Sequence, residues 1–265
     1  MDFLFATLQQ TIAAYAWPMF RISSMLMVMA IFGASTTPTR VRLLMAIAIT
    51  VAVAPMLPPM PQEDLLSLKS TLITLQQVLI GVAMGFVSLM LMQIFVLTGQ
   101  IIGMQTSLGF ASMVDPSSGQ QTPVVGNFFL VLTTLIFLSV NGHLIMLRML
   151  IASFNTIPVS TSGMSLGSYR QIAEWGSYMF GAALTMSLSA IIALLIINLS
   201  FGVMTRAAPQ LNIFAIGFPV TMIGGLIILW LTLDQIMGHF GEVWHSAQVL
   251  MCDVAGLQCN LDGVP

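Results

Sequence analysis

The chain has 265 residues, of which 57% are hydrophobic and only 6% are charged, and its formal net charge is −2. An ordinary soluble domain carries roughly 25% charged residues, so seven basic and nine acidic side chains cannot cover a soluble globule of this size. The composition indicates a chain embedded in a membrane or enclosed by other subunits, and the slightly negative charge argues against a nucleic-acid partner.

Six apolar runs follow one another along the chain, and five of them exceed the ~20 residues that a helix needs to cross a bilayer. The run at 43–57 is short and ends in the tract PMLPPMP, which predicts the end of a helix. The run at 71–102 is too long, because a helix of that length extends about 48 Å against a hydrocarbon core of about 30 Å. We expect it to tilt, bend or protrude. The runs cover residues 10–33, 43–57, 71–102, 124–152, 175–204 and 211–232.

Arg21 lies inside the first apolar run, three residues after Pro18. A charged side chain at such a position faces protein or water rather than lipid. We interpret Arg21 as a structural residue held in an ion pair. The alternative is a role in carrying protons or ions, but the sequence has no chain of acids suited to a relay.

Two glycine pairs mark the long third run, Gly81 with Gly85 and Gly99 with Gly103. The two pairs are eighteen residues apart, which is five helical turns, so all four glycines share one face of a helix. Such a face lets another helix approach closely. We therefore predict that these four glycines form a helix-packing stripe.

The middle of the chain is interrupted by GMQTSLGFASMVDPSSGQQTPVVG, residues 103–126. Asp115 is the single charged residue between positions 70 and 147, and it precedes a proline and a tract of Ser, Gly and Gln. Residues of these types break regular structure and form turns. The local pattern predicts a loop, and it leaves open whether that loop is a plain connection or a working part.

Two later stretches also read as breaks between helices. In NGHL, Asn141 and His143 are best explained by an Asn-Gly turn or helix break. Arg206 opens RAAPQLNIFAIGFP, in which a proline separates two apolar segments. We predict structural polar roles for Asn141, His143 and Arg206.

Catalytic and metal-binding patterns are missing from the sequence. His239, Glu242 and His245 are spaced by three in HFGEVWH, but Gly241 and the single acid weaken a metal site. The spacing between Cys252 and Cys259 fits no metal motif, and a disulfide between them requires an oxidising compartment. We expect no cofactor, no metal and no enzyme activity.

Five stretches, in this order along the chain, resemble the FliR family of flagellar export-gate proteins. The injectisome counterparts are also similar, but the motifs favour the flagellar branch. The resemblance runs from about residue 15 to about residue 240, and it matches neither the tract 117–122 nor the tail. The stretches are RVRLLMAIAITVAVAPMLP (40–58), QQVLIGVAMG (76–85), GQIIGMQTSLGFASMVDP (99–116), NGHL (141–144) and RAAPQLNIFAIGFP (206–219).

The resemblance implies an all-α, membrane-associated fold of long kinked helices, with a FliP-like unit followed by a FliQ-like helical hairpin. It implies one export-gate domain over 1–240, and a tail over 241–265 has no assigned role. The implied partners are FliP-like and FliQ-like subunits, other export-apparatus membrane proteins and unfolded flagellar export substrates. The implied location is the bacterial inner membrane and the flagellar basal body, as a multi-pass protein.

The resemblance also gives the mid-chain break a role, as a loop over about 106–123 that plugs the export channel. Three apolar side chains in it are available to block a narrow pore, and an acid and a proline fix the turn. Residues 117–122 are small and polar. The predicted plug residues are Phe110, Met113, Val114, Asp115 and Pro116.

Two other classes of protein compete with a subunit of an export channel. A stand-alone secondary transporter or ion channel predicts ionisable groups near the membrane midplane and an internal repeat, and we find no clear repeat. A membrane enzyme would need a catalytic set. Co-purification separates an export-channel subunit from a stand-alone transporter, because a transporter should be stable alone and a gate subunit should need its partners.

Overall fold

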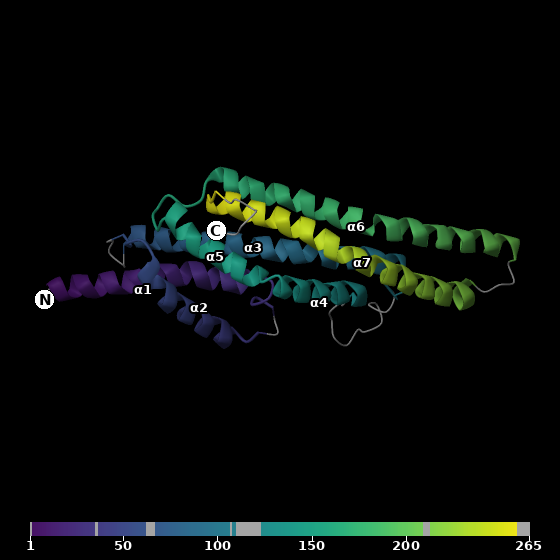
Figure 1. Ribbon diagram of the computed structural model, residues 1–265, viewed down its shortest axis with the longest axis horizontal. Helices are drawn as coiled ribbons and strands as arrows, with labels where there is room; N and C mark the ends of the chain where they lie inside the picture. Colours follow the sequence, from purple (N-terminus) through teal and green to yellow (C-terminus); the bar gives the residue numbers. More distant parts are fainter. Residues whose placement is uncertain are drawn as a thin grey trace. The chain divides into compact units, whose positions relative to one another are not determined.

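A computed structural model describes residues 2–34, 37–61, 67–106, 108–109, 123–208 and 213–258, with the backbone alone for 2–8 and 213–216. Within these ranges the regular structure is entirely helical (Figure 1). Helices satisfy every backbone hydrogen bond within one segment, which an apolar environment requires. The predicted all-α, membrane-type fold class is therefore confirmed.

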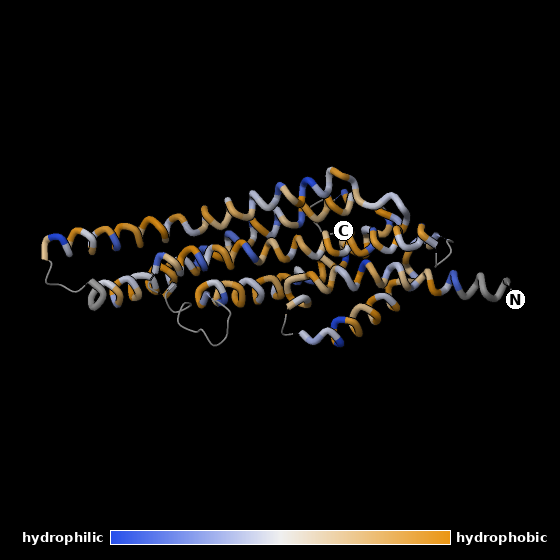
Figure 2. Tube along the Cα trace, turned by 180° about the vertical axis from the view of Figure 1, so that it is seen from behind, coloured by the Kyte–Doolittle hydropathy of each residue, from blue (hydrophilic) through white to orange (hydrophobic). Residues whose placement is uncertain are grey.

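Three of the helices are much longer than a bilayer crossing. Helices of 38, 42 and 43 residues (α3, α6 and α7) extend about 57–65 Å at about 1.5 Å per residue. Apolar residues predominate along most of their length (Figure 2). The elements are α1 Asp2–Val28, α2 Thr39–Val53, the 3₁₀ helix η1 Ala54–Met56, α3 Leu68–Gln105, α4 Val124–Ser139, α5 Gly142–Thr156, α6 Leu166–Ala207 and α7 Ile213–Ala255.

Four helical segments in the described part of the chain are long and apolar enough to cross a membrane, or five if α4 and α5 form one broken span. One of the four is Thr39–Met56, although the apolar run at 43–57 is by itself shorter than a span. The helix begins at Thr39, before that run, and η1 lengthens its end. The proline tract acts where it was expected, since α2 ends at Val53 and Pro55 lies in η1.

The predicted run at 124–152 is two helices, because the chain breaks at Asn141. This residue has φ 54° and ψ 27°, in the left-handed region, and α5 begins directly after it at Gly142. Asparagine tolerates this conformation better than other non-glycine residues. His143 follows in the first turn of α5, where its Nδ1 is buried without a hydrogen-bond partner in the described residues.

The left-handed backbone at Asn141 predicts different effects on stability for two substitutions. Asn141→Val should destabilise the protein by about 1–2 kcal/mol, because a β-branched side chain clashes in this region. Asn141→Gly should be close to neutral, since glycine adopts positive φ freely. Thermal unfolding of both variants in detergent tests this, and equal midpoints for the two would contradict it.

The helices of the described chain form two compact units. The predicted boundary at residue 240 lies inside α7, which is continuous to Ala255. Near the end of α7, Cys252 is disulfide-bonded, and Cys259 lies outside the described residues. Unit 1 comprises Met1–Met90, Val140–Gly176 and Ser246–Pro265, and unit 2 comprises Leu91–Ser139 and Ser177–His245.

Each unit has a core of large apolar side chains. In unit 1, Trp17, Ile73 and Phe154 belong to a buried hydrophobic cluster. In unit 2, Phe95 and Phe240 lie with ring centroids 5.9 Å apart. Other rings pack edge-to-face in unit 2, where Phe137 meets Trp244 at 5.2 Å. Aromatic pairs of this kind add to the free energy of burial.

Candidate functional site: the base of the predicted plug loop

The five predicted plug residues, Phe110, Met113, Val114, Asp115 and Pro116, lie outside the described residues. The structure does describe the two helices between which they lie, and both belong to unit 2 at this point. Helix α3 ends at Gln105, and α4 begins at Val124 after Pro123. We call the contacts of these two helix ends the loop base.

At the loop base, α3 and α4 pack against each other through glycine. A Cβ added at Gly99 would lie 2.6 Å from Phe129 Cδ2, 2.8 Å from the Cα of Gly126 and 2.8 Å from the carbonyl oxygen of Val125. A Cβ at Gly126 would meet the carbonyl oxygen of Val96 at 3.2 Å. The backbones approach too closely for side chains between them. The chain therefore leaves α3 and enters α4 at a tightly packed point.

A third helix contacts the start of the loop. Thr106 is buried, and its hydroxyl donates to the carbonyl oxygen of Gly103 at 2.9 Å. Gly225 of α7 lies directly against the Thr106 side chain, so that a Cβ at 225 would collide with it. The last turn of α3 is thus held by its own hydrogen bond and by α7.

Sequence reasoning missed Gly126, Thr106 and Gly225. Two signals were available for the glycines, since Gly126 follows the loop after Pro123 and Gly225 belongs to a Gly-Gly pair in an apolar run. Neither signal identifies the partner helix. Thr106 carried no signal, because a threonine beside a loop is ordinary.

The predicted glycine stripe meets two different helices. In unit 1, Gly81 lies against Ser24 and the Arg21 carbonyl of α1, and Gly85 lies against Met25 of α1. In unit 2, Gly99 and Gly103 lie against α4. Gly103 is the loosest of the four, with the Val125 side chain at 3.5 Å from an added Cβ.

Arg21 is completely buried in unit 1, but the predicted ion pair is not present among the described residues. Its guanidinium donates from Nε to Gln77 Oε1 at 2.8 Å, to Ser153 Oγ at 3.1 Å and to the Ile157 carbonyl oxygen at 2.9 Å. Its Cζ lies 4.1 Å from the ring centroid of Phe154. Neutral oxygens and an aromatic face therefore take the place of a carboxylate. The cluster joins α1 to α3 and α5.

The remaining predicted polar residue, Arg206, is exposed in the last turn of α6. A cation there faces the negative end of the helix dipole. Among the described residues, no hydrogen bond or salt bridge joins Arg206 to the loop base. It is an independent feature of the end of α6.

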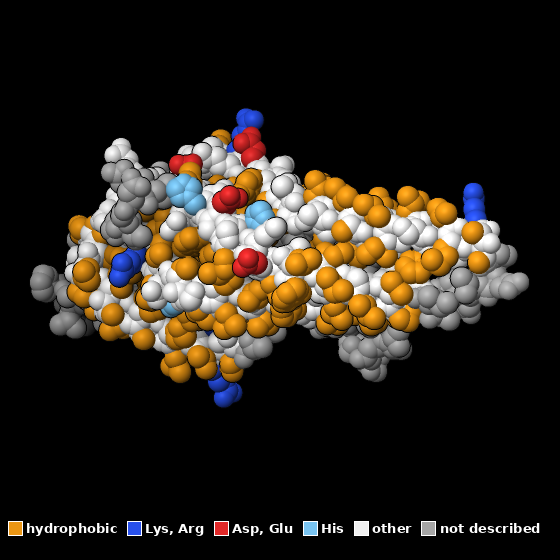
Figure 3. All heavy atoms as spheres, turned by 45° about the vertical axis from the view of Figure 1, so that its right-hand side comes forward, with side chains coloured by type: hydrophobic (Ala, Val, Ile, Leu, Met, Phe, Trp, Pro, Cys, Tyr) orange, Lys and Arg blue, Asp and Glu red, His pale blue; other side chains and the backbone are white. Residues whose placement is uncertain are grey.

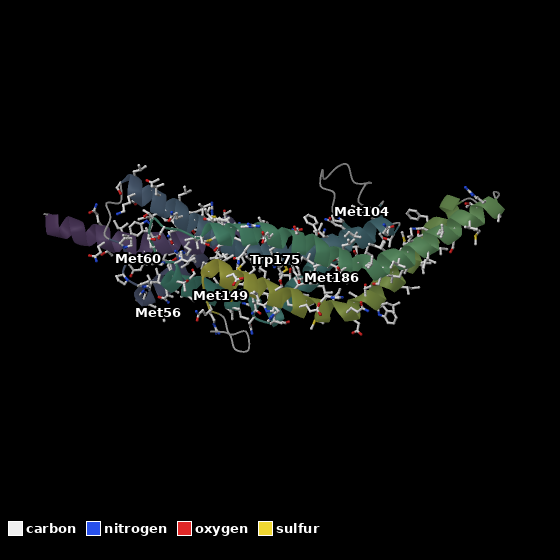
Figure 4. The ribbon with its side chains drawn as sticks, turned by 90° about the horizontal axis from the view of Figure 1, so that it is seen from above. Met56, Met60, Met104, Met149, Trp175 and Met186 are labelled. Carbon is white, nitrogen blue, oxygen red and sulfur yellow. The ribbon has the colours of Figure 1, made fainter. Side chains whose placement is uncertain are left out.

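Exposed apolar side chains are numerous on this chain, and charged ones are few (Figure 3). Met104, the residue before the last of α3, is 77% exposed beside the loop base, and Met186 of α6 lies with its sulfur 4.0 Å from Thr98 Oγ1 (Figure 4). Leu188, Ile192, Leu195 and Leu199 are also exposed along α6. Apolar surface on this scale needs lipid or protein to cover it.

Comparison with known sequences identifies the protein family of this chain. Residues 12–247 match the family described as bacterial export proteins, family 1. The chain belongs to this family, whose curated relatives are FliR proteins. The match indicates a component of an export apparatus rather than an enzyme. Together with the apolar helices, it indicates a multi-pass protein of the bacterial inner membrane.

Three relatives of this FliR-family chain cover most of its length. The flagellar biosynthetic protein FliR of Escherichia coli (strain K12) is 35% identical over 240 residues, 91% of this chain and 92% of the relative. That of Pectobacterium carotovorum subsp. carotovorum is 32% identical over 243 residues, 92% and 93%. That of Aquifex aeolicus (strain VF5) is 30% identical over 217 residues, 82% and 84%.

Proposed function

We propose that this chain is a structural and gating subunit of the flagellar type III protein-export channel. In this proposal it assembles with FliP-like and FliQ-like subunits and other export-apparatus membrane proteins. Unfolded flagellar proteins pass through the assembled channel. The loop over about 106–123 plugs that channel in its closed state.

The family match over residues 12–247 is the observation that carries the flagellar assignment. The relatives named above are flagellar biosynthetic proteins, and each aligns with more than four fifths of this chain. A match of this extent covers both ends of the loop, the whole of α3 and α6, and α7 as far as residue 247. The role in flagellar export follows from that membership.

The exposed faces of α6 and α7 support assembly with other subunits. On α6 within unit 2, apolar side chains stay exposed from Phe180 to Val203. Buried residues of α6 occupy only a narrow stripe, through Ala183, Ser187 and Leu194. A helix that is apolar on its outer face must be covered, and in a multi-subunit channel the neighbouring subunits cover it.

The loop base supports the plug. A loop that closes a pore needs rigid ends, because its blocking side chains are positioned only as well as the helices that hold them. Gly99 with Gly126, and Thr106 with Gly225, provide that rigidity on both sides of the loop. The apolar side chains of Phe110, Met113 and Val114 would then resist ions by excluding water from a constriction.

Deleting residues 110–122 tests the gating role. The shortened chain should still co-purify with its FliP-like and FliQ-like partners, because the helices that contact them are unchanged. The reconstituted complex should conduct ions at least tenfold better than the intact one. Single-complex conductance in planar bilayers measures the difference.

A matched control keeps Phe110 to Pro116 and replaces residues 117–122 by a Gly/Ser tract of equal length, which should leave conductance low. Equal conductance of deleted and intact complexes would contradict the plug while leaving the assembly role in place. A chain that purifies alone, stable and without partners would contradict the assembly role and favour a stand-alone transporter.

A further inference from the structure

Within unit 2, helix α7 carries a second helix-packing seam that the described chain does not cover. One face of α7 is buried against this chain through Leu229, Ile236, Phe240 and Val243. A second set is exposed, at positions separated alternately by four and three residues. This spacing is the repeat by which two helices pack along a left-handed seam. The outer seam of α7 consists of Ile223, Ile227, Trp230, Asp234, Met237 and Gly241.

The outer seam is long and open. It extends over 223–241, about 27 Å at about 1.5 Å per residue. Trp230 is 72% exposed and Met237 is 61% exposed. Beside them is an open hollow of about 500 Å³, lined among the described residues by Trp230, Leu231, Leu233 and Asp234. Apart from the neighbouring backbone of α7 itself, no described atom lies within 4 Å of a Cβ added at Gly241, so another helix could approach there closely.

The centre of the outer seam is acidic. Asp234 is exposed and lies near the middle of Gly217–Ala255, one of the segments apolar enough to cross a membrane. It has no salt bridge within the described residues. An ionised carboxylate flanked by Trp230, Leu231 and Met237 is unfavourable next to lipid, and it is stabilised by a cation brought beside it.

We propose that the outer seam of α7 packs against an apolar helix of a different subunit, and that this helix carries a lysine or arginine opposite Asp234. The proposal rests on the proposed function in one respect, that the chain assembles with other membrane subunits. Apolar residues on either side of Asp234 supply the contact area. The single charge pair then selects the partner and sets the register of the two helices.

The charge of Asp234 argues against two other occupants of the outer seam, lipid and a second copy of this chain. Lipid would leave the carboxylate without a partner at membrane depth. A second copy of this chain, packed through the same seam about a twofold axis, would bring two Asp234 carboxylates together near the centre of the contact. Like charges placed together oppose association. A basic helix of another subunit satisfies both the apolar surface and the acid.

Charge substitution in the assembled complex tests the proposal. The tagged chain is produced together with the other flagellar export-gate subunits and purified in mild detergent, and partner subunits recovered per tagged chain are quantified. We expect Asp234→Lys to reduce recovery at least tenfold and Asp234→Glu to retain it. Glu242→Lys is the matched control, because Glu242 is an exposed acid of the same helix outside the seam, and it should change recovery less than twofold. Unchanged recovery with Asp234→Lys would overturn the proposal.

Photo-crosslinking identifies the occupant directly. Its result does not depend on whether the lysine variant folds. A benzophenone amino acid placed at Met237 should crosslink to a peptide of another subunit that has Lys or Arg within one helical turn. Changing that basic residue to Asp should restore assembly of Asp234→Lys. A peptide without a basic residue, a crosslinked dimer of this chain, or lipid adducts alone would each overturn the proposal. If the unmodified chain recovers no partners at all, the proposed function itself fails.

Discussion

Replacing Arg21 by alanine is expected to lower the stability of the protein by about 3–5 kcal/mol, one of the two largest effects that we predict for a single substitution. The guanidinium is fully buried, and it supplies hydrogen bonds to Gln77 Oε1 and to the Ile157 carbonyl oxygen. Alanine leaves both oxygens without this donor, and it also leaves a cavity beside Phe154. Both losses act on the contact of α1 with α3 and α5.

The conservative variant Arg21→Lys separates charge from geometry. Lysine keeps the positive charge, but its single nitrogen cannot reach all three acceptors that the three guanidinium nitrogens of Arg21 reach, and it packs less well over the Phe154 ring. We expect its stability to lie between those of the wild-type protein and Arg21→Ala. The thermal midpoint of the purified complex in detergent measures the order.

Arg40→Ala is the matched control for Arg21, since Arg40 belongs to the same unit and is exposed. Its removal should change the midpoint little, because an exposed side chain contributes little to stability. If Arg21→Ala and Arg40→Ala melted at the same temperature, the buried cluster would not contribute the stability that its contacts indicate.

Replacing Gly99 by alanine is expected to destabilise the loop base by about 1–3 kcal/mol, because the added methyl group overpacks a tight contact. Two of its three close neighbours are backbone atoms, the Cα of Gly126 and the carbonyl oxygen of Val125. Backbone cannot rotate away as a side chain can, so α3 and α4 must separate. The thermal midpoint should fall, and a gate held by this contact should conduct ions more readily.

The control lies four residues further along α3. A Cβ at Gly103 would be 3.5 Å from its nearest neighbours, two atoms of the Val125 side chain, an ordinary contact distance. Alanine is also a better helix former than glycine by about 1 kcal/mol. Gly103→Ala should therefore be neutral or slightly stabilising. Destabilisation of the same size at both positions would show that packing at Gly99 is not the cause.

The helical architecture was predictable from sequence, because it depends on local properties. Apolar runs require helices, and prolines at 55–61 end one of them. Asn141 was recognised as a break from the Asn-Gly pair alone, and its positive φ gives the reason. The bounds were less accurate, since α2 begins before its apolar run and α7 continues to Ala255.

The partners of individual residues were not predictable in the same way. Arg21 was expected in an ion pair, yet its hydrogen-bond partners are neutral residues 56, 132 and 136 positions away. Nothing near Arg21 in the sequence indicates Gln77 or Ser153. The glycine pairs indicated close packing, but they could not indicate that Gly81 meets α1 and Gly99 meets α4.

The helical and apolar character of this chain, and a break in its middle, were predictable from the residues alone, because composition and Gly or Pro placement act within a few residues of where they occur. Which face of α7 is buried, and which remains open around Asp234, is seen only in the folded chain. Apolar residues surround most of that helix, so its sequence favours no single face. The choice depends on contacts with α3 and α4, which come together only when the chain folds.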